Sequence, residues 1–153
     1  MKVTDFSRVR DEIKGRLDSD SLPGDKLLEV VKLLREEVDH YDWVGFYVAS
    51  PEEKELSLGP FSGAPTEHTE IVYGEGICGQ AAELESTFIV DDVSDENNYL
   101  SCSPEVESEI VLPIFSNGDL VGELDIDSHQ RGAFTDRDEE FLREVTRLVS
   151  RLL

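Results

Sequence analysis

The sequence predicts an α+β fold, in which helices pack on one side of an antiparallel sheet. Apolar residues recur with helical spacing near both ends of the chain, whereas the middle carries short runs rich in β-branched and aromatic residues. An Asn-Gly turn within 116–119 separates two of these runs and predicts a hairpin, hence antiparallel pairing. Because helices and strands do not alternate regularly, a parallel α/β sheet is not expected.

Three helices are predicted from single apolar stripes. The stripes are Phe6, Val9, Ile13 and Leu17; Leu27, Val31, Leu34 and Val38; and Phe141, Val145, Leu148 and Leu152. Each stripe places apolar side chains on one face, so each helix should pack against the rest of the protein with that face. Pro23 and Gly24 separate the first two helices, and Thr135 with Asp138 predicts a capping box at the start of the last.

Strands are predicted between the second and the last helix. They cover 43–48, 87–90, 110–115 and 120–127, with weaker candidates at 55–58 and 69–72. No repeat or linker interrupts the chain, so we expect one domain over 1–153. Its parts would be N-terminal helices (1–39), the sheet with a pocket (41–128) and a C-terminal helix (135–153).

The chain is strongly acidic, with 35 acidic and 14 basic residues and a net charge of -21. No stripe of Lys and Arg is available to neutralise phosphates, so nucleic acid is not expected as a partner, and anionic membrane surfaces would repel the chain. No apolar run is long enough to span a membrane, and the N-terminus lacks a signal-peptide pattern. Two cysteines cannot form a disulfide framework, so we expect a cytoplasmic protein with free thiols.

The acidity has two interpretations: an ordinary solvated surface with excess acid, or adaptation to concentrated salt. Only 5 of the 14 basic residues are Lys, and acids occur in nearly every polar stretch. At molar salt the Debye length falls to about 3 Å, so repulsion that would strain the fold in dilute buffer disappears. We expect a halophilic protein whose stability rises with added KCl.

The two cysteines lie in different local contexts. The segment 74–79 matches the G-x-G-x-x-G pattern, but the long helix and parallel strand of a dinucleotide site are missing, so a turn opening a short helix is expected. Cys78 would then lie near a helix N-terminus, which stabilises a thiolate; the alternative is a buried, apolar role. Cys102 lies in a polar segment that is expected to be accessible, although nearby acids disfavour its thiolate.

Strand alternation places Trp43, Gly45 and Tyr47 on one face of the first strand. Two aromatics about 13 Å apart with a glycine between them would form a slot for a small ligand. The alternative is that both rings pack beneath a loop.

Three carboxylates, Glu123, Asp125 and Asp127, share one face of the returning strand. In so acidic a protein the row could be a solvated strand face. It could also be a cluster that binds an ammonium group or holds a proton through mutual repulsion, with Glu109 joining from the neighbouring strand. The three histidines show no paired ligand spacing, so no metal or cofactor is expected.

Several segments together resemble the free methionine-(R)-sulfoxide reductases, which are stand-alone GAF-domain enzymes. In order, these segments are Trp43–Tyr47, Leu58–Phe61, Gly74–Gly79, Ser101–Cys102, Ser108–Ile114 and Gly122–Ser128. The resemblance implies a GAF fold: a six-stranded antiparallel sheet with helices on one face and a ligand pocket on the other. It also implies reduction of free methionine (R)-sulfoxide to methionine, with thioredoxin or a similar thiol as reductant, and a homodimer by analogy.

The resemblance assigns roles to particular residues. It implies a nucleophile at Cys102, a second cysteine at Cys78, pocket carboxylates at Glu109, Asp125 and Asp127, and enclosing aromatics at Trp43 and Tyr47. The family usually has a third cysteine shortly after the Gly-Pro-Phe segment, whereas 63–71 here has none and carries Glu67 or His68 in its place. Cys78 would resolve an oxidised Cys102 if their Cα atoms lie within about 7 Å, and otherwise an external thiol must do so.

Three functions therefore compete. The first is an active reductase. The second is a GAF module that binds a small molecule and signals through a partner. The third is a redox sensor in which Cys78 and Cys102 switch by forming a disulfide.

Overall fold

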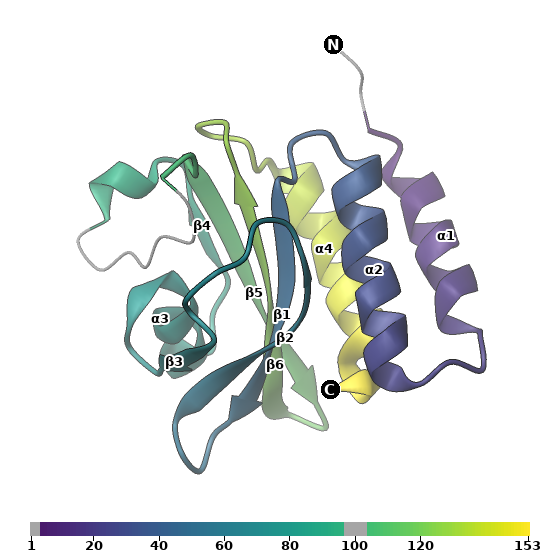
Figure 1. Ribbon diagram of the computed structural model, residues 1–153, viewed down its shortest axis with the longest axis horizontal. Helices are drawn as coiled ribbons and strands as arrows, with labels where there is room; N and C mark the ends of the chain where they lie inside the picture. Colours follow the sequence, from purple (N-terminus) through teal and green to yellow (C-terminus); the bar gives the residue numbers. More distant parts are fainter. Residues whose placement is uncertain (1–3, 97–103) are drawn as a thin grey trace.

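A six-stranded antiparallel sheet forms the centre of the protein, with helices on both of its faces (Figure 1). The computed structural model describes residues 4–96 and 104–153. Its elements are α1 (Phe6–Leu17), α2 (Pro23–Glu37), β1 (Trp43–Ser50), β2 (Glu55–Ser62), β3 (Glu70–Val72), α3 (Gly76–Leu84), β4 (Phe88–Val90), η1 (Val93–Asp95), β5 (Ser108–Ser116), β6 (Asp119–Ser128), α4 (Asp136–Val149) and η2 (Ser150–Leu152). The strand order is β3-β2-β1-β6-β5-β4, which confirms the predicted α+β class.

The three helices predicted from apolar stripes, α1, α2 and α4, cover one face of the sheet (Figure 1). Their buried side chains pack on alternate residues of the central strands. On the sheet these are Val44, Phe46, Ile110, Leu112, Ile114, Leu124 and Ile126. Helix α2 begins at Pro23, whose fixed φ suits the first helical position, and α4 begins with the predicted capping box of Thr135 and Asp138.

Helix α3 lies alone on the opposite face, where it covers a second, smaller apolar cluster. Its buried residues include Ile77, Cys78, Ala81 and Ala82, and they pack near Val111 of β5. A short helix with small side chains covers only part of this face.

The hairpin β5–β6 sets the register of the site. Its turn has Asn117 at φ 54° and Gly118 at φ 85°, the left-handed conformations that the Asn-Gly pair predicts. Both strands run slightly beyond their predicted bounds, and Glu109 pairs directly with Asp127. Adjacent strands therefore carry their carboxylates at the same level of the sheet.

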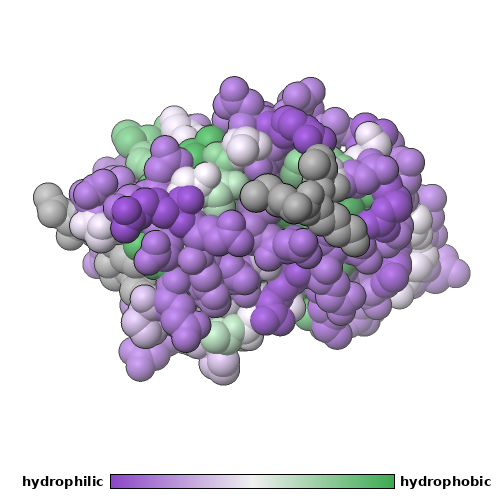
Figure 2. Space-filling model, turned by 90° about the horizontal axis from the view of Figure 1, so that it is seen from above, coloured by the Kyte–Doolittle hydropathy of each residue, from purple (hydrophilic) through white to green (hydrophobic). Residues whose placement is uncertain are grey.

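The surface agrees with the composition. Figure 2 shows a face that is predominantly hydrophilic, with small and scattered hydrophobic patches. Among the helices of the described residues, none combines the length and the apolar character needed to span a membrane.

Candidate functional site

A small cavity lies on the face of the sheet that carries α3, at the edge of that helix. The residues that line it are Trp43, Tyr47, Thr66, His68, Ile71, Gly76, Ile77, Cys78, Glu109, Asp125 and Asp127. All of the predicted site residues within the described part of the chain are in this lining. Cys102, the predicted nucleophile, lies outside the described residues.

The cavity is small, with a volume of about 20 Å³. That is close to the space needed for one water molecule. A larger open groove of about 740 Å³ lies between the β4–β5 edge and α4, and its lining contains Arg143 and Arg147. None of the predicted site residues lines that groove, so size alone does not identify the site.

Glu109, Asp125 and Asp127 are buried side by side, with 4%, 5% and 2% of their surfaces exposed. Burial, followed by the nearby charges of Asp125 and Asp127, raises the pKa of Glu109 well above its ordinary range. Hydrogen bonding to the same two carboxylates adds to this rise, because the protonated form of Glu109 is the donor. The row is therefore a buried cluster that holds a proton, and the alternative of a solvated strand face is wrong.

Glu123 extends the same row deeper into the protein. Its side chain is fully buried, and neither carboxylate oxygen has a hydrogen-bond partner among the described residues. Burial and then the charge of Asp125 raise the pKa of Glu123, while the nearby thiol of Cys78 opposes the rise. The sequence places Glu123 on this face but gives no sign that it would lose all contact with solvent.

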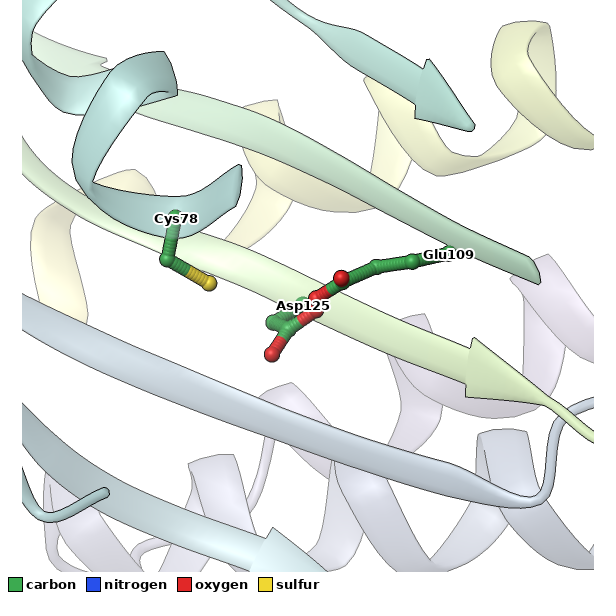
Figure 3. A group of neighbouring side chains, drawn as sticks. All are labelled: Cys78, Glu109 and Asp125. Carbon is green, nitrogen blue, oxygen red and sulfur yellow. The ribbon is translucent and has the colours of Figure 1, made fainter. Parts of the chain in front are cut away.

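Cys78 occupies the first turn of α3 and is buried. Its sulfur points toward Asp125 (Figure 3). The expected stabilisation of a thiolate by the helix N-terminus is outweighed: burial, followed by the charges of Asp125 and Glu123, raises the pKa of Cys78 well above its ordinary value. Burial and the neighbouring acids therefore favour the neutral thiol over the thiolate.

Gly79 allows α3 to come this close to the sheet. A Cβ atom at this position would lie 2.6 Å from the carbonyl oxygen of Val72 in β3, a distance that no side chain tolerates. The glycine-rich segment therefore has a packing role, because it brings the thiol of Cys78 over the carboxylates.

The two aromatic residues fix the loop formed by residues 63–69. The indole of Trp43 donates a hydrogen bond to the carbonyl oxygen of Ala64 at 2.9 Å, and the hydroxyl of Tyr47 donates one to that of His68 at 2.9 Å. The expected slot above Gly45 is filled by the indole of Trp43, since a Cβ at Gly45 would lie 2.4 Å from this ring. The structure supports the alternative, in which both aromatic rings pack beneath a loop. The cavity lies beside these two rings.

Sequence reasoning did not predict Ile71, Gly76 and Ile77 as members of the cavity, and it also missed two polar residues, Thr66 and His68. These two belong to the loop that replaces the cysteine-bearing stretch of the resembled family. Loop residues follow no periodicity. The only signal for His68 was that it stands near the place where the resembled family has its third cysteine.

Within residues 4–96 and 104–153, the lining contains several acids and no Lys or Arg. The sulfur of Cys78 and one carboxylate oxygen each of Glu109 and Asp125 lie within 4.8 Å of one another (Figure 3). An uncompensated negative cluster of this kind attracts a cation, either an ammonium group or a metal ion.

Comparisons with known proteins agree with this geometry. The GAF domain family matches residues 25–153. The free methionine-R-sulfoxide reductase of Escherichia coli is 36% identical over 121 residues, covering 79% of this chain and 72% of that protein. The enzyme of the same name from Saccharomyces cerevisiae is 41% identical over 112 residues, covering 72% of this chain and 62% of that protein.

Solved structures give the same result. The free methionine-R-sulfoxide reductase of Neisseria meningitidis, solved in complex with its substrate, superimposes with a TM-score of 0.91. It is 31% identical, and the match covers 99% of this chain and 92% of that chain. By fold, sequence and motif order, the chain belongs to the free methionine-R-sulfoxide reductase family of GAF-domain proteins.

Proposed function

We propose that the protein reduces free methionine (R)-sulfoxide to methionine, using cysteine thiols as the electron source. The observation that carries this proposal is the buried cluster of Glu109, Asp125 and Asp127 in a cavity without Lys or Arg. Such a cluster offers a protonated acid and a negative charge in one enclosed place. These are the two groups that a zwitterionic sulfoxide substrate needs.

Cys102 is the proposed nucleophile, and Glu109 the proposed acid. The thiolate of Cys102 attacks the sulfoxide sulfur while Glu109, whose raised pKa keeps it protonated, donates its proton to the sulfoxide oxygen. The net step transfers one oxygen atom, so that methionine is released and Cys102 becomes a sulfenic acid. The substrate sulfur is reduced by two electrons and the cysteine sulfur is oxidised by two.

Asp125 and Asp127 are proposed to bind the ammonium group of the substrate, which would favour a free amino acid over a peptide. Trp43 and Tyr47 enclose the other end, where sulfur–aromatic contacts contribute about 0.3–1.5 kcal/mol. The cavity of about 20 Å³ is too small for an amino acid. Entry therefore requires the loop of residues 63–69 to move away from these two rings.

Cys78 is the proposed resolving thiol. It would attack the sulfenic sulfur of Cys102 and displace hydroxide, which leaves as water after taking up a proton, so that a disulfide forms. An external dithiol, thioredoxin or a similar reductant, would then supply two electrons to restore both thiols. Because Cys78 rests as a neutral, buried thiol, direct resolution by an external thiol is the alternative.

The experiment is a single turnover of reduced protein with free methionine (R)-sulfoxide, in molar KCl, with the loss of free thiols counted alongside. We expect one methionine per protein and two thiols lost per turnover. Cys102→Ser should form no methionine, whereas Cys78→Ser should form one equivalent and fail to continue. Well-folded protein that forms no methionine would contradict the proposal and favour a ligand-binding GAF module.

We further propose that the chain works in the cytoplasm, as a homodimer, in concentrated salt. The support for the last point is the net charge of -21 with few lysines. The thermal midpoint of unfolding should rise by several degrees or more between dilute buffer and molar KCl, because salt screens the self-repulsion. A midpoint independent of KCl concentration would contradict salt adaptation, and sedimentation in the same buffers tests the dimer.

A further inference from the structure

The cluster of Cys78, Glu109 and Asp125 brings metal-ligating atoms together in a way that binding of the substrate's ammonium group does not require. Carboxylates alone suffice to bind an ammonium group, yet here a thiol lies among them. One atom from each of the three side chains lies within 4.8 Å of the other two, and the three come from α3, β5 and β6 (Figure 3). One sulfur and two oxygens converge from three elements, and both kinds of donor are ones that zinc accepts.

A second observation concerns the space between these ligands. The cavity that they line has a volume of about 20 Å³, which accepts a single ion or water molecule and excludes an amino acid. Oxygen Oδ1 of Asp125, a lining residue, is buried and has no hydrogen-bond partner among the described residues. A buried carboxylate oxygen without a donor is strongly unfavourable, and a cation beside it removes that penalty.

The surrounding charge favours the same conclusion. Asp127 also lines the cavity. The buried carboxyl of Glu123, which is on the same face of β6 as Asp127, lies near Cys78. Among the residues that the structure describes, the lining includes no Lys or Arg. A thiolate ligand selects a borderline or soft metal over Mg²⁺ or Ca²⁺, which require oxygen ligands only.

We infer that Cys78, Glu109 and Asp125 form a binding site for a thiophilic divalent cation such as Zn²⁺, which occupies the small cavity and competes with the amino-acid substrate. Three protein ligands leave a fourth position for water, as in open tetrahedral zinc sites. The side chains must close by about 1 Å to reach bond lengths of roughly 2.0 Å to oxygen and 2.3 Å to sulfur. The competition rests on the proposed function, whereas the metal site itself does not.

The test is a titration of reduced, chelator-treated protein with Co²⁺ in the absence of oxygen, followed by optical absorption. Tetrahedral Co²⁺ with one thiolate ligand gives a sulfur-to-metal charge-transfer band in the near ultraviolet and visible d–d bands. We expect one equivalent to bind, with both features, and Zn²⁺ to abolish them by displacement. Binding without the charge-transfer band, or no binding, overturns the proposal.

Two variants and one matched control identify the ligands. Cys78→Ser should lose the charge-transfer band, and Asp125→Asn should weaken Co²⁺ binding about tenfold or more. Cys102→Ser, the control that removes the other thiol, should keep the band. A band that disappears with Cys102 and survives without Cys78 overturns the proposal. Circular dichroism and melting curves of the three variants identify any that fail to fold, and either Cys78→Ser or Asp125→Asn alone is decisive.

Activity supplies an independent comparison. In single-turnover assays Zn²⁺ should raise the substrate concentration needed for half-maximal methionine formation, and substrate should weaken Co²⁺ binding. Inhibition by Zn²⁺ that persists undiminished in Cys78→Ser overturns the proposal. If the protein forms methionine but binds no Co²⁺, only the metal site fails. If Co²⁺ binds through Cys78 but no methionine forms, only the reductase function fails.

Discussion

Buried carboxylates occur on both faces of the sheet, and their protonation differs. On the face covered by three helices, Asp138 accepts hydrogen bonds from the Tyr41 hydroxyl at 2.8 Å and the Thr135 backbone N–H at 2.9 Å, and it pairs with His40 at 2.7 Å. Burial alone would raise the pKa of Asp138, yet the contacts with His40, Thr135 and Tyr41 lower it. On the cavity face, Glu109 is surrounded by other acids, and its pKa is raised.

The difference shows that donors, and not burial alone, decide whether a buried acid is charged. Asp138 is held as a carboxylate. It completes the capping box at the start of α4, and its hydrogen bond from Tyr41 connects this helix to the segment before β1, so its role is in stability. Glu109 and Glu123 have no such donors among the described residues, so their surroundings favour the neutral form. The following predictions test this contrast, from the largest expected effect to the smallest.

Glu109→Gln should cause the largest change, and it should affect the rate. Removing the protonated acid of the cavity face is expected to slow methionine formation about 10²–10⁴-fold, as for loss of a general acid. Single-turnover assays of wild type and variant give this ratio. Asp138→Asn, which alters the buried acid on the other face, is the control and should keep the rate within a few-fold. A Glu109→Gln variant that forms methionine at the wild-type rate would show that Glu109 is not the proton donor.

Leu124→Ala should instead reduce stability. Leu124 is fully buried beneath the three helices, between Phe46 and Leu112 on the neighbouring strands. Truncation there leaves a cavity and should lower the free energy of unfolding by about 2–5 kcal/mol. Urea unfolding in molar KCl measures the change. A loss below about 1 kcal/mol would mean that this face repacks freely.

Asp138→Asn should cost about 1–3 kcal/mol at neutral pH, since it removes the charged acceptor for three donors. The folded pKa of Asp138 is lowered, so its stabilisation is fully present above the unfolded value of about 4 and is lost as pH falls through the folded value. The difference from wild type should therefore be constant from pH 5 to 8 and shrink below pH 4. A difference that persists undiminished in acid would assign the effect to packing.

Glu123→Leu should have the smallest effect, with the opposite sign. The pKa of Glu123 is raised, so this group destabilises the fold as pH rises above the unfolded value of about 4.3. Replacing it with an apolar side chain should raise the free energy of unfolding by about 1–2 kcal/mol near pH 7 and by less near pH 4. Asp119→Leu, at the exposed start of the same strand, is the control and should change stability little. A destabilised Glu123→Leu variant would show that the carboxyl has a partner.

Much of the fold followed from the sequence because each element has a local signal. The apolar stripes predicted α1, α2 and α4, and the Asn117-Gly118 turn predicted the β5–β6 hairpin. The period of two along β6 placed Asp125 and Asp127 on one face. The motif order identified the family and, with it, the carboxylates and aromatics of the cavity.

The electrostatic state of the site could be decided only by the tertiary structure. Local sequence left two roles open for Cys78, a reactive thiol near a helix N-terminus or a buried, apolar residue. Packing of α3 against β5 and β6 placed this thiol among buried acids, and its pKa is raised. Local sequence could not distinguish a solvated row of acids from a buried one either. Alternation says which side chains share a face, whereas the element that covers the face decides their dielectric surroundings. Here α3 and the loop of residues 63–69 provide that cover, and long-range contacts of this kind leave no periodic signal in the chain.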